Sequence, residues 1–145
     1  MLTALLVLAA VMFGLYNVFI KLSAAHIQPL LGAVVLQFVA AFIGLGFMLA
    51  LKVAQGLSFH AAPRGIIMAV AAGIAIGLVE ILTFVIYGKG IPVAVGNPLI
   101  IGGSIIVTTS LGVWWLRESL GWVPSVAVLL IAAGIMLLAW DAARA

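Results

Sequence analysis

The residue best suited to chemistry in this chain is a glutamate inside a long apolar segment. Glu80 lies within the run 65–87, about fifteen residues after Gly65, and so about 22 Å along a helix of roughly 33 Å. An ionised carboxylate at that depth of a bilayer costs a few kcal/mol. Glu80 must therefore face protein or water, meet a cationic partner or take up a proton.

Helical spacing places Glu80 on a face of small residues. Gly73, Gly77 and Glu80 fall on one stripe of a helix, and such glycines allow a neighbouring helix to approach closely. We therefore predict that Gly73 and Gly77 pack against another helix. Two interpretations of Glu80 stay open. It could exchange a proton or a cation beside a substrate pathway, or it could be a structural carboxyl bonded to a neighbouring helix.

Three further polar residues in apolar segments are candidate partners of Glu80 in the structural interpretation: Tyr16, Asn17 and Gln37. A phenol or an amide in lipid must find a hydrogen-bond partner. Tyr16 and Asn17 could line a cavity together with Glu80, or could join helices by hydrogen bonds. Both interpretations stay open for this pair.

The fourth apolar segment contains a second polar feature near its start. Pro98 removes a backbone donor and disfavours helix in the residue before it, so Gly96 and Pro98 predict a helix break. Asn97 could then bond a freed carbonyl group or a ligand, which makes it a candidate substrate-binding residue. A simple kink without a binding role is the alternative. Irregular backbone at this depth is tolerated where it lines a cavity or is buried in protein.

No known catalytic pattern accompanies these residues. The chain has no cysteine, no zinc-protease or phosphate-loop motif and no Gly-x-Ser-x-Gly elbow. His26 and His60 fall in loops or at helix ends, without a visible acid or base partner. We therefore expect no enzyme, no catalytic residue, no metal site and no cofactor.

The elements that position these side chains follow from composition. Of 145 residues 68% are hydrophobic and only 6% are charged, with a mean hydropathy of +1.48. A soluble domain carries roughly 25% charged residues, so the solvent here is lipid. Five segments reach the ~20 residues that a membrane helix needs. We predict an all-α integral membrane protein, a single domain over 1–145, with spans at about 2–22, 30–53, 65–87, 93–116 and 121–140.

The first span could instead be a cleaved signal peptide, but it lacks a basic start and is long for one, so we expect a retained helix.

The six cations do not decide the orientation of five spans. With the termini on opposite sides, Lys52, Arg64 and Arg117 face one side, against the three others on the opposite side. Orientation follows the Lys and Arg bias of short loops, and here there is none. Insertion in both orientations, with an antiparallel homodimer, is one hypothesis, and a fixed orientation with the N-terminus inside is the other. Because the cations are scattered singly, we expect no nucleic-acid partner.

Two short patterns are similar to those of a known family. The run from Phe13-Gly14 through Asn17 to Lys21 resembles the first helix of EamA-type proteins in the drug/metabolite transporter superfamily. Near the end of the chain, Glu118 and Leu120, followed by a glycine-bearing helix, resemble the close of that family's repeat. Departures from the pattern are Arg117 in place of Gly, Ala127 in place of Gly and Pro124 in place of Gln.

The resemblance covers essentially the whole chain and implies one five-helix repeat, where family members usually carry two in inverted orientation. It implies a second copy, or a sister chain, as partner. Inverted repeats commonly hold a transport site at their interface. We expect a proton-coupled transporter or exporter of a small metabolite, an amine or a lipophilic cation in a cell membrane, the bacterial inner membrane being the expected one. The alternatives are a non-transporting subunit that stabilises a partner complex, and a component that flips a lipid-linked group.

Overall fold

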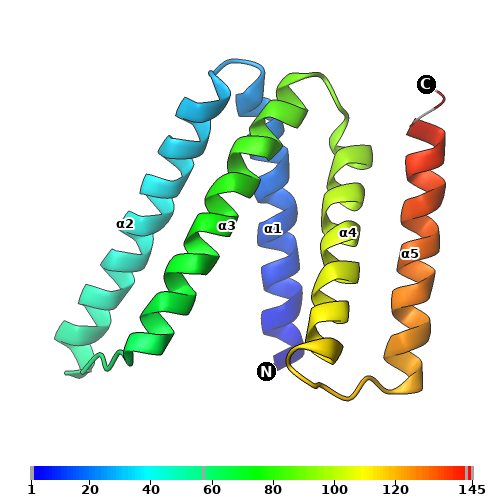
Figure 1. Ribbon diagram of the computed structural model, residues 1–145. Helices are drawn as coiled ribbons and strands as arrows, with labels where there is room; N and C mark the ends of the chain where they lie inside the picture. The colour runs from blue at the N-terminus through cyan, green and yellow to red at the C-terminus, as the bar shows by residue number, and fades with distance from the viewer. Residues whose placement is uncertain (1, 57, 143, 145) are drawn as a thin grey trace. The chain divides into compact units, whose positions relative to one another are not determined.

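The structure, a computed structural model, describes residues 2–56, 58–142 and 144. These residues form five helices and no strand: α1 (Leu2–Ala24), α2 (Pro29–Gln55), α3 (Pro63–Gly88), α4 (Val93–Trp114) and α5 (Trp122–Ala142) (Figure 1). Each is long and apolar enough to cross a membrane. The all-α class and the five spans are confirmed, with helix ends within three residues of those predicted.

Local sequence explains where the helices begin and end. Pro29 and Pro63 stand at the first turn of α2 and α3, where a missing N–H is not needed. The Gln28 side chain accepts a hydrogen bond from the Leu31 N–H at 3.0 Å and caps α2. Gly56 ends α2 in the left-handed conformation, with φ of 61°, which glycine adopts without strain.

The fourth helix ends two residues earlier than the sequence predicted. Its last residue is Trp114, and Arg117 then takes a positive φ of 55°, which an α-helix does not allow. The apolar run continues through Leu116, so hydropathy alone could not show that the chain turns there.

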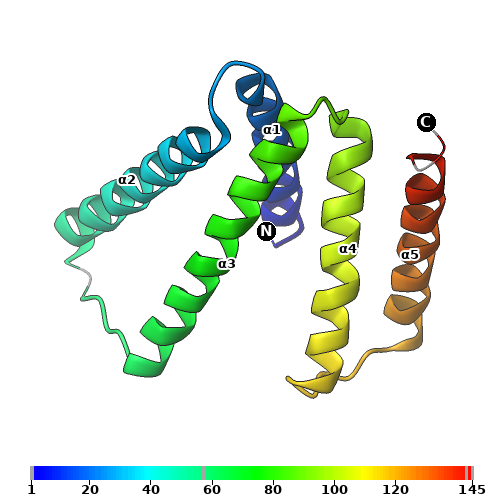
Figure 2. The same ribbon diagram turned by 45° about the horizontal axis from the view of Figure 1, so that its top comes forward.

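The chain divides into two compact units, Met1–Gly90 and Ile91–Ala145. In the first unit, α3 packs against both α1 and α2 (Figures 1 and 2). In the second unit, α4 and α5 form an antiparallel hairpin. The single domain over 1–145 stays a prediction.

Buried residues of the first unit gather towards one end of its helices. Ile20 and Ala24 of α1, Ala33 of α2, and Phe84 and Tyr87 of α3 form its apolar core. Towards the end of α2 and the start of α3 the two helices diverge, as Figure 2 shows. The tightly packed part of this unit therefore contains the C-terminal halves of α1 and α3 and the N-terminal part of α2.

Candidate functional site

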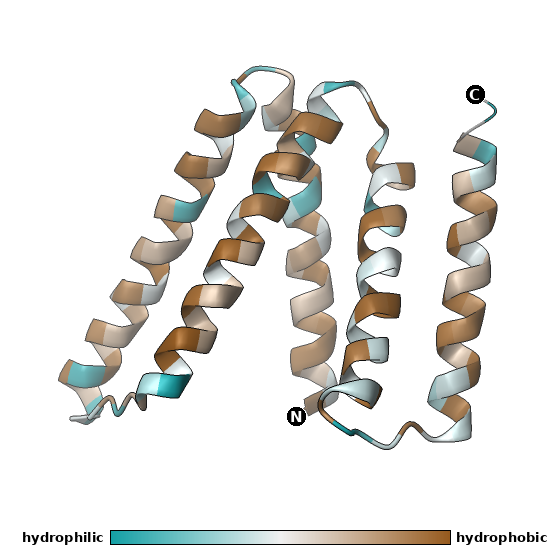
Figure 3. Cartoon of the chain, in the orientation of Figure 1, coloured by the Kyte–Doolittle hydropathy of each residue, from teal (hydrophilic) through white to brown (hydrophobic). Residues whose placement is uncertain are grey.

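Two buried stripes face each other across α1 and α3. Asn17, Ile20 and Ala24 repeat at helical spacing on α1. On α3 the buried residues are Glu80, Thr83, Phe84 and Tyr87. Tyr16 and Glu80 each lie about two turns before the end of their helix, and so at one level. Figure 3 shows hydrophilic turns on both helices at this level, within otherwise hydrophobic spans.

Glu80 is almost completely buried, with 2% of its surface exposed. The Tyr16 hydroxyl donates a hydrogen bond to its Oε1 atom. Its other oxygen, Oε2, is buried and has no hydrogen-bond partner among the residues that the structure describes. Of the three partners that the sequence suggested, Tyr16 therefore makes the bond. The arrangement leaves one buried carboxyl oxygen without a partner, and that oxygen can hold a proton.

A second set of polar contacts lies nearer the C-terminal ends of the same helices. The Tyr87 hydroxyl donates to Asn17 Oδ1 at 3.5 Å, and the Asn17 amide donates to the Phe13 carbonyl at 2.9 Å. The Lys21 ammonium donates to the Tyr87 carbonyl at 3.0 Å and lies 5.9 Å from the Tyr87 ring centre. This cation therefore caps the C-terminal end of α3, where the helix dipole favours positive charge.

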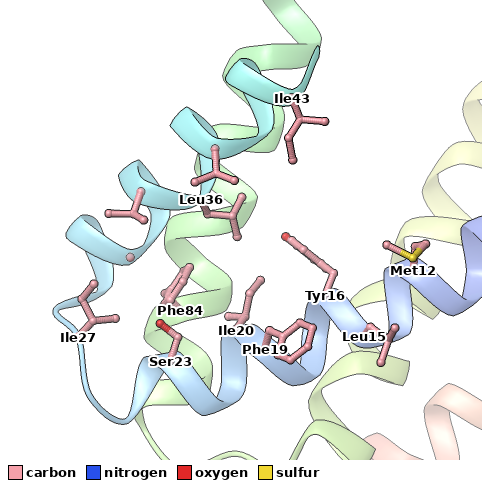
Figure 4. A pocket seen from close by; sticks show the side chains of 13 residues that line it. Met12, Leu15, Tyr16, Phe19, Ile20, Ser23, Ile27, Leu36, Ile43 and Phe84 are labelled. Atoms are coloured by element: carbon pink, nitrogen blue, oxygen red, sulfur yellow. The ribbon is translucent and has the colours of Figure 1, made fainter. Parts of the chain in front are cut away.

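A cavity of about 480 Å³ opens beside this pair of stripes, between α1, α2 and α3. Figure 4 shows Tyr16 extending from α1 into it, with Phe84 and Leu36 on the facing helices. Its wall is almost entirely apolar, and the hydroxyls of Tyr16 and Ser23 are its polar side-chain groups. Glu80 does not line it, whereas Tyr16, which bonds the Glu80 carboxyl, does.

Helix α2 packs against α3 beside this site through glycines and the Gln37 amide. A Cβ atom added at Gly32 would overlap the Phe84 ring, so only glycine fits there. A Cβ atom added at Gly77 would lie 3.2 Å from the Gln37 amide, so Gly77 does face α2. At Gly73 an added Cβ would meet nothing within 4 Å in the described part of the chain. The packing role of Gly73 stays a prediction.

The remaining predicted residues lie in the second unit. Asn97 is in the first turns of α4, and its role as a substrate-binding residue stays a prediction. The structure differs from the predicted helix break at Gly96 and Pro98, because α4 continues through both residues. Pro98 removes a single backbone bond, to Ala94, and the neighbouring ladder is enough to hold the helix.

Lys21, Thr83 and Tyr87 make polar contacts next to the Tyr16–Glu80 pair, and the sequence did not single them out. Thr83, Phe84 and Tyr87 follow Glu80 by three, four and seven residues, which is the spacing of one helix face. That signal could have found Tyr87. In the sequence, Lys21 is one of the cations counted for orientation and the last residue of the first family-like pattern, and its bond to a carbonyl of α3 has no signature there.

Comparison with known proteins adds no relative. No family model, no curated protein and no solved structure matches the chain. Among the described residues there is also no cluster of three or more side chains able to hold a metal ion. The function must therefore be argued from the site alone.

Proposed function

We propose that this chain is a proton-coupled secondary transporter or exporter of a small metabolite, an amine or a lipophilic cation. The single observation that carries the proposal is the buried Glu80 carboxyl, bonded on one oxygen to Tyr16 and unpartnered on the other, beside an apolar cavity. Buried ionisable groups in membrane helices are costly and mark ion or substrate pathways. The cavity size suits a small organic molecule.

The proposed mechanism is an exchange at the carboxyl group. When Glu80 releases its proton, the carboxylate attracts a cationic or hydrogen-bonding substrate. When it takes a proton up from the other side of the membrane, that substrate leaves. Such exchange moves the substrate against its gradient only when the protein exposes the site to each side in turn.

A second copy, or a sister chain, is part of this proposal. The proposed chain is one EamA-like repeat in a cell membrane, with the bacterial inner membrane as the proposed location. Its α5 has no buried residue in the part of the helix that the structure describes. In a membrane, the part of α5 that does not pack on α4 faces either lipid or a partner, and a pairing copy would bury part of it.

Flux measurements in vesicles test the transport proposal. Purified wild type in proteoliposomes is expected to accumulate at least one member of a panel of amines and metabolites when a pH gradient is applied. Glu80→Gln, which keeps the side-chain shape and removes the titratable proton, should abolish that accumulation. Glu118→Gln, the same change at an exposed position, is the matched control and should behave as wild type. Accumulation by Glu80→Gln at the wild-type rate contradicts the proposal.

The interhelical Tyr16–Glu80 bond also favours one competing function, that of a non-transporting membrane subunit. In that function Glu80 holds α1 and α3 together, and the unburied faces contact a partner complex. The state of the purified assembly separates the two. A symmetric assembly of this chain with flux supports transport, whereas co-purification with a fixed partner and no flux in the panel supports the subunit.

A further inference from the structure

We propose that an amine ligand must displace the Tyr16 hydroxyl from the Glu80 carboxylate in order to bind, so that this hydroxyl acts as a lock on Glu80. This inference rests on the proposed function, because it concerns the same site and names how the ligand reaches it. Tyr16 lines the cavity and donates to Glu80 Oε1, while Glu80 itself lines no part of the cavity. A ligand in the cavity therefore meets the phenol before it meets the carboxylate.

The walls of the cavity define the chemistry of that ligand. Phe19, Ile20, Val39 and Phe84 offer only apolar contacts, so the body of the ligand must be apolar. The group that can attract it beyond these walls is the Glu80 carboxylate, which Tyr16 bonds. That group has no cationic partner among the residues described, because Lys21 is engaged with the Tyr87 carbonyl. A small apolar molecule with one charged amine satisfies both requirements.

Few other side chains on the surrounding helices can donate a hydrogen bond or offer a positive charge to the Glu80 carboxylate. On α1 the titratable or charged side chains near it are Tyr16 and Lys21, and on α3 the remaining one is Tyr87. From α2 the nearby polar side chain is the uncharged Gln37 amide. Tyr16 alone of these side chains donates to Glu80 in the described structure. An incoming amine therefore competes with one donor.

Competition between the phenol and the amine predicts the direction in which Tyr16→Phe changes the affinity for the amine. If the ammonium takes the place of the phenol, then the wild type loses the Tyr16–Glu80 bond on binding. Tyr16→Phe has no such bond to lose, and it keeps the aromatic ring that lines the cavity. Because a hydrogen bond to a charged group is worth more than a neutral one, the variant should bind the amine about tenfold more tightly. If the phenol instead contacts the ligand directly, Tyr16→Phe should bind the amine more weakly.

The experiment is calorimetric titration of the full chain in lipid nanodiscs with phenethylamine at mildly alkaline pH. Phenethyl alcohol, its uncharged counterpart, is the matched ligand. Tyr87→Phe is the matched variant, because it loses the same hydroxyl from a residue that bonds Asn17 instead of Glu80. Expected are tighter amine binding by Tyr16→Phe, wild-type affinity in Tyr87→Phe, no change for the alcohol, and no amine preference in Glu80→Gln.

Three results overturn the proposal: equal or weaker amine binding by Tyr16→Phe, the same gain in Tyr87→Phe, or no amine binding by either wild type or Tyr16→Phe. If a variant misfolds, a measurement on the wild type still tests the proposal. Infrared difference spectra on amine addition should show a shift of a phenol C–O band that persists in Tyr87→Phe, and a flat spectrum contradicts the lock.

The inference and the transport proposal fail separately. Amine binding with the expected sign but without flux in vesicles leaves the lock intact and rejects transport. Flux that depends on Glu80 together with unchanged binding in Tyr16→Phe rejects the lock and leaves transport intact.

Discussion

At the scale of single residues, the Asn17 amide is the polar group whose removal leaves a buried partner on another helix without a hydrogen bond. It is 4% exposed and has two partners, the Phe13 carbonyl and the Tyr87 hydroxyl. Removing it leaves that hydroxyl buried without an acceptor. Thr83 is equally buried, but its hydroxyl donates to the Val79 carbonyl of its own helix, 2.8 Å away. The two residues thus differ in whether they join helices.

Replacing Asn17 with leucine should therefore lower the free energy of unfolding by about 1–2 kcal/mol, the cost of an orphaned buried group together with a lost interhelical bond. Thr83→Val should cost less than about 0.5 kcal/mol, because it loses only a bond within α3. Unfolding in mixed micelles, followed by circular dichroism against denaturant, measures both. Equal losses in the two variants would show that the Asn17–Tyr87 contact contributes nothing.

Part of this site could be predicted from the sequence, and the rest could not. Glu80 and Tyr16 are recognisable because a polar group in an apolar run must find a partner, and few partners exist. Which of Tyr16, Asn17 and Gln37 bonds Glu80 depends on the relative heights of α1, α2 and α3, and no periodicity encodes those heights. The Lys21 bond to a backbone carbonyl was not predictable, because every residue has such a carbonyl.

At the scale of helices, glycine positions decide which pairs can approach. Gly32 admits the Phe84 ring, and in the second unit Gly102 admits Ile135, whose Cγ1 atom would lie 2.5 Å from an added Cβ. Gly44, Gly46 and Gly103 have nothing within 4 Å in the described structure. Hydropathy predicts the five helices well because length and apolarity suffice for that. It does not predict these contacts, because both lipid and helix faces are apolar.

Gly32→Ala should destabilise the first unit by about 1–3 kcal/mol, because the buried Phe84 ring has to move. Gly44→Ala, on the same helix with open space around it, should be neutral or slightly stabilising through the better helix propensity of alanine. Thermal unfolding of the two variants in one detergent compares them directly. A loss of similar size in both would mean that the cost arises within α2 and not at Phe84.

The second hairpin offers a rescue experiment. Gly102→Ala should weaken the packing of α4 on α5 by about 1–3 kcal/mol, because the new methyl group overlaps Ile135. Shortening the neighbour with Ile135→Ala should restore part of that loss in the double variant. A double-mutant cycle on unfolding free energies measures the coupling, and strict additivity would show that the two side chains do not meet.

At the scale of the whole molecule, the balanced cations leave the orientation open to small changes. A reporter fused to the C-terminus should be active on both sides of the membrane if the chain inserts both ways. One lysine added between residues 58 and 62 should then shift the signal towards one side, because it creates the missing bias. Activity on one side alone in the wild type rejects dual insertion and favours a fixed orientation.

The depth of Glu80 also has an electrical consequence. About two turns separate it from the end of α3, which places it roughly a third of the way across the span from the Lys21 end. A full elementary charge crossing a membrane gains about 2.3 kcal/mol per 100 mV. A proton that reaches Glu80 from the near side therefore senses roughly 0.8 kcal/mol per 100 mV, and from the far side roughly 1.5. In the proposed transport cycle, the membrane potential would therefore change the free energies of proton loading from the two sides by unequal amounts.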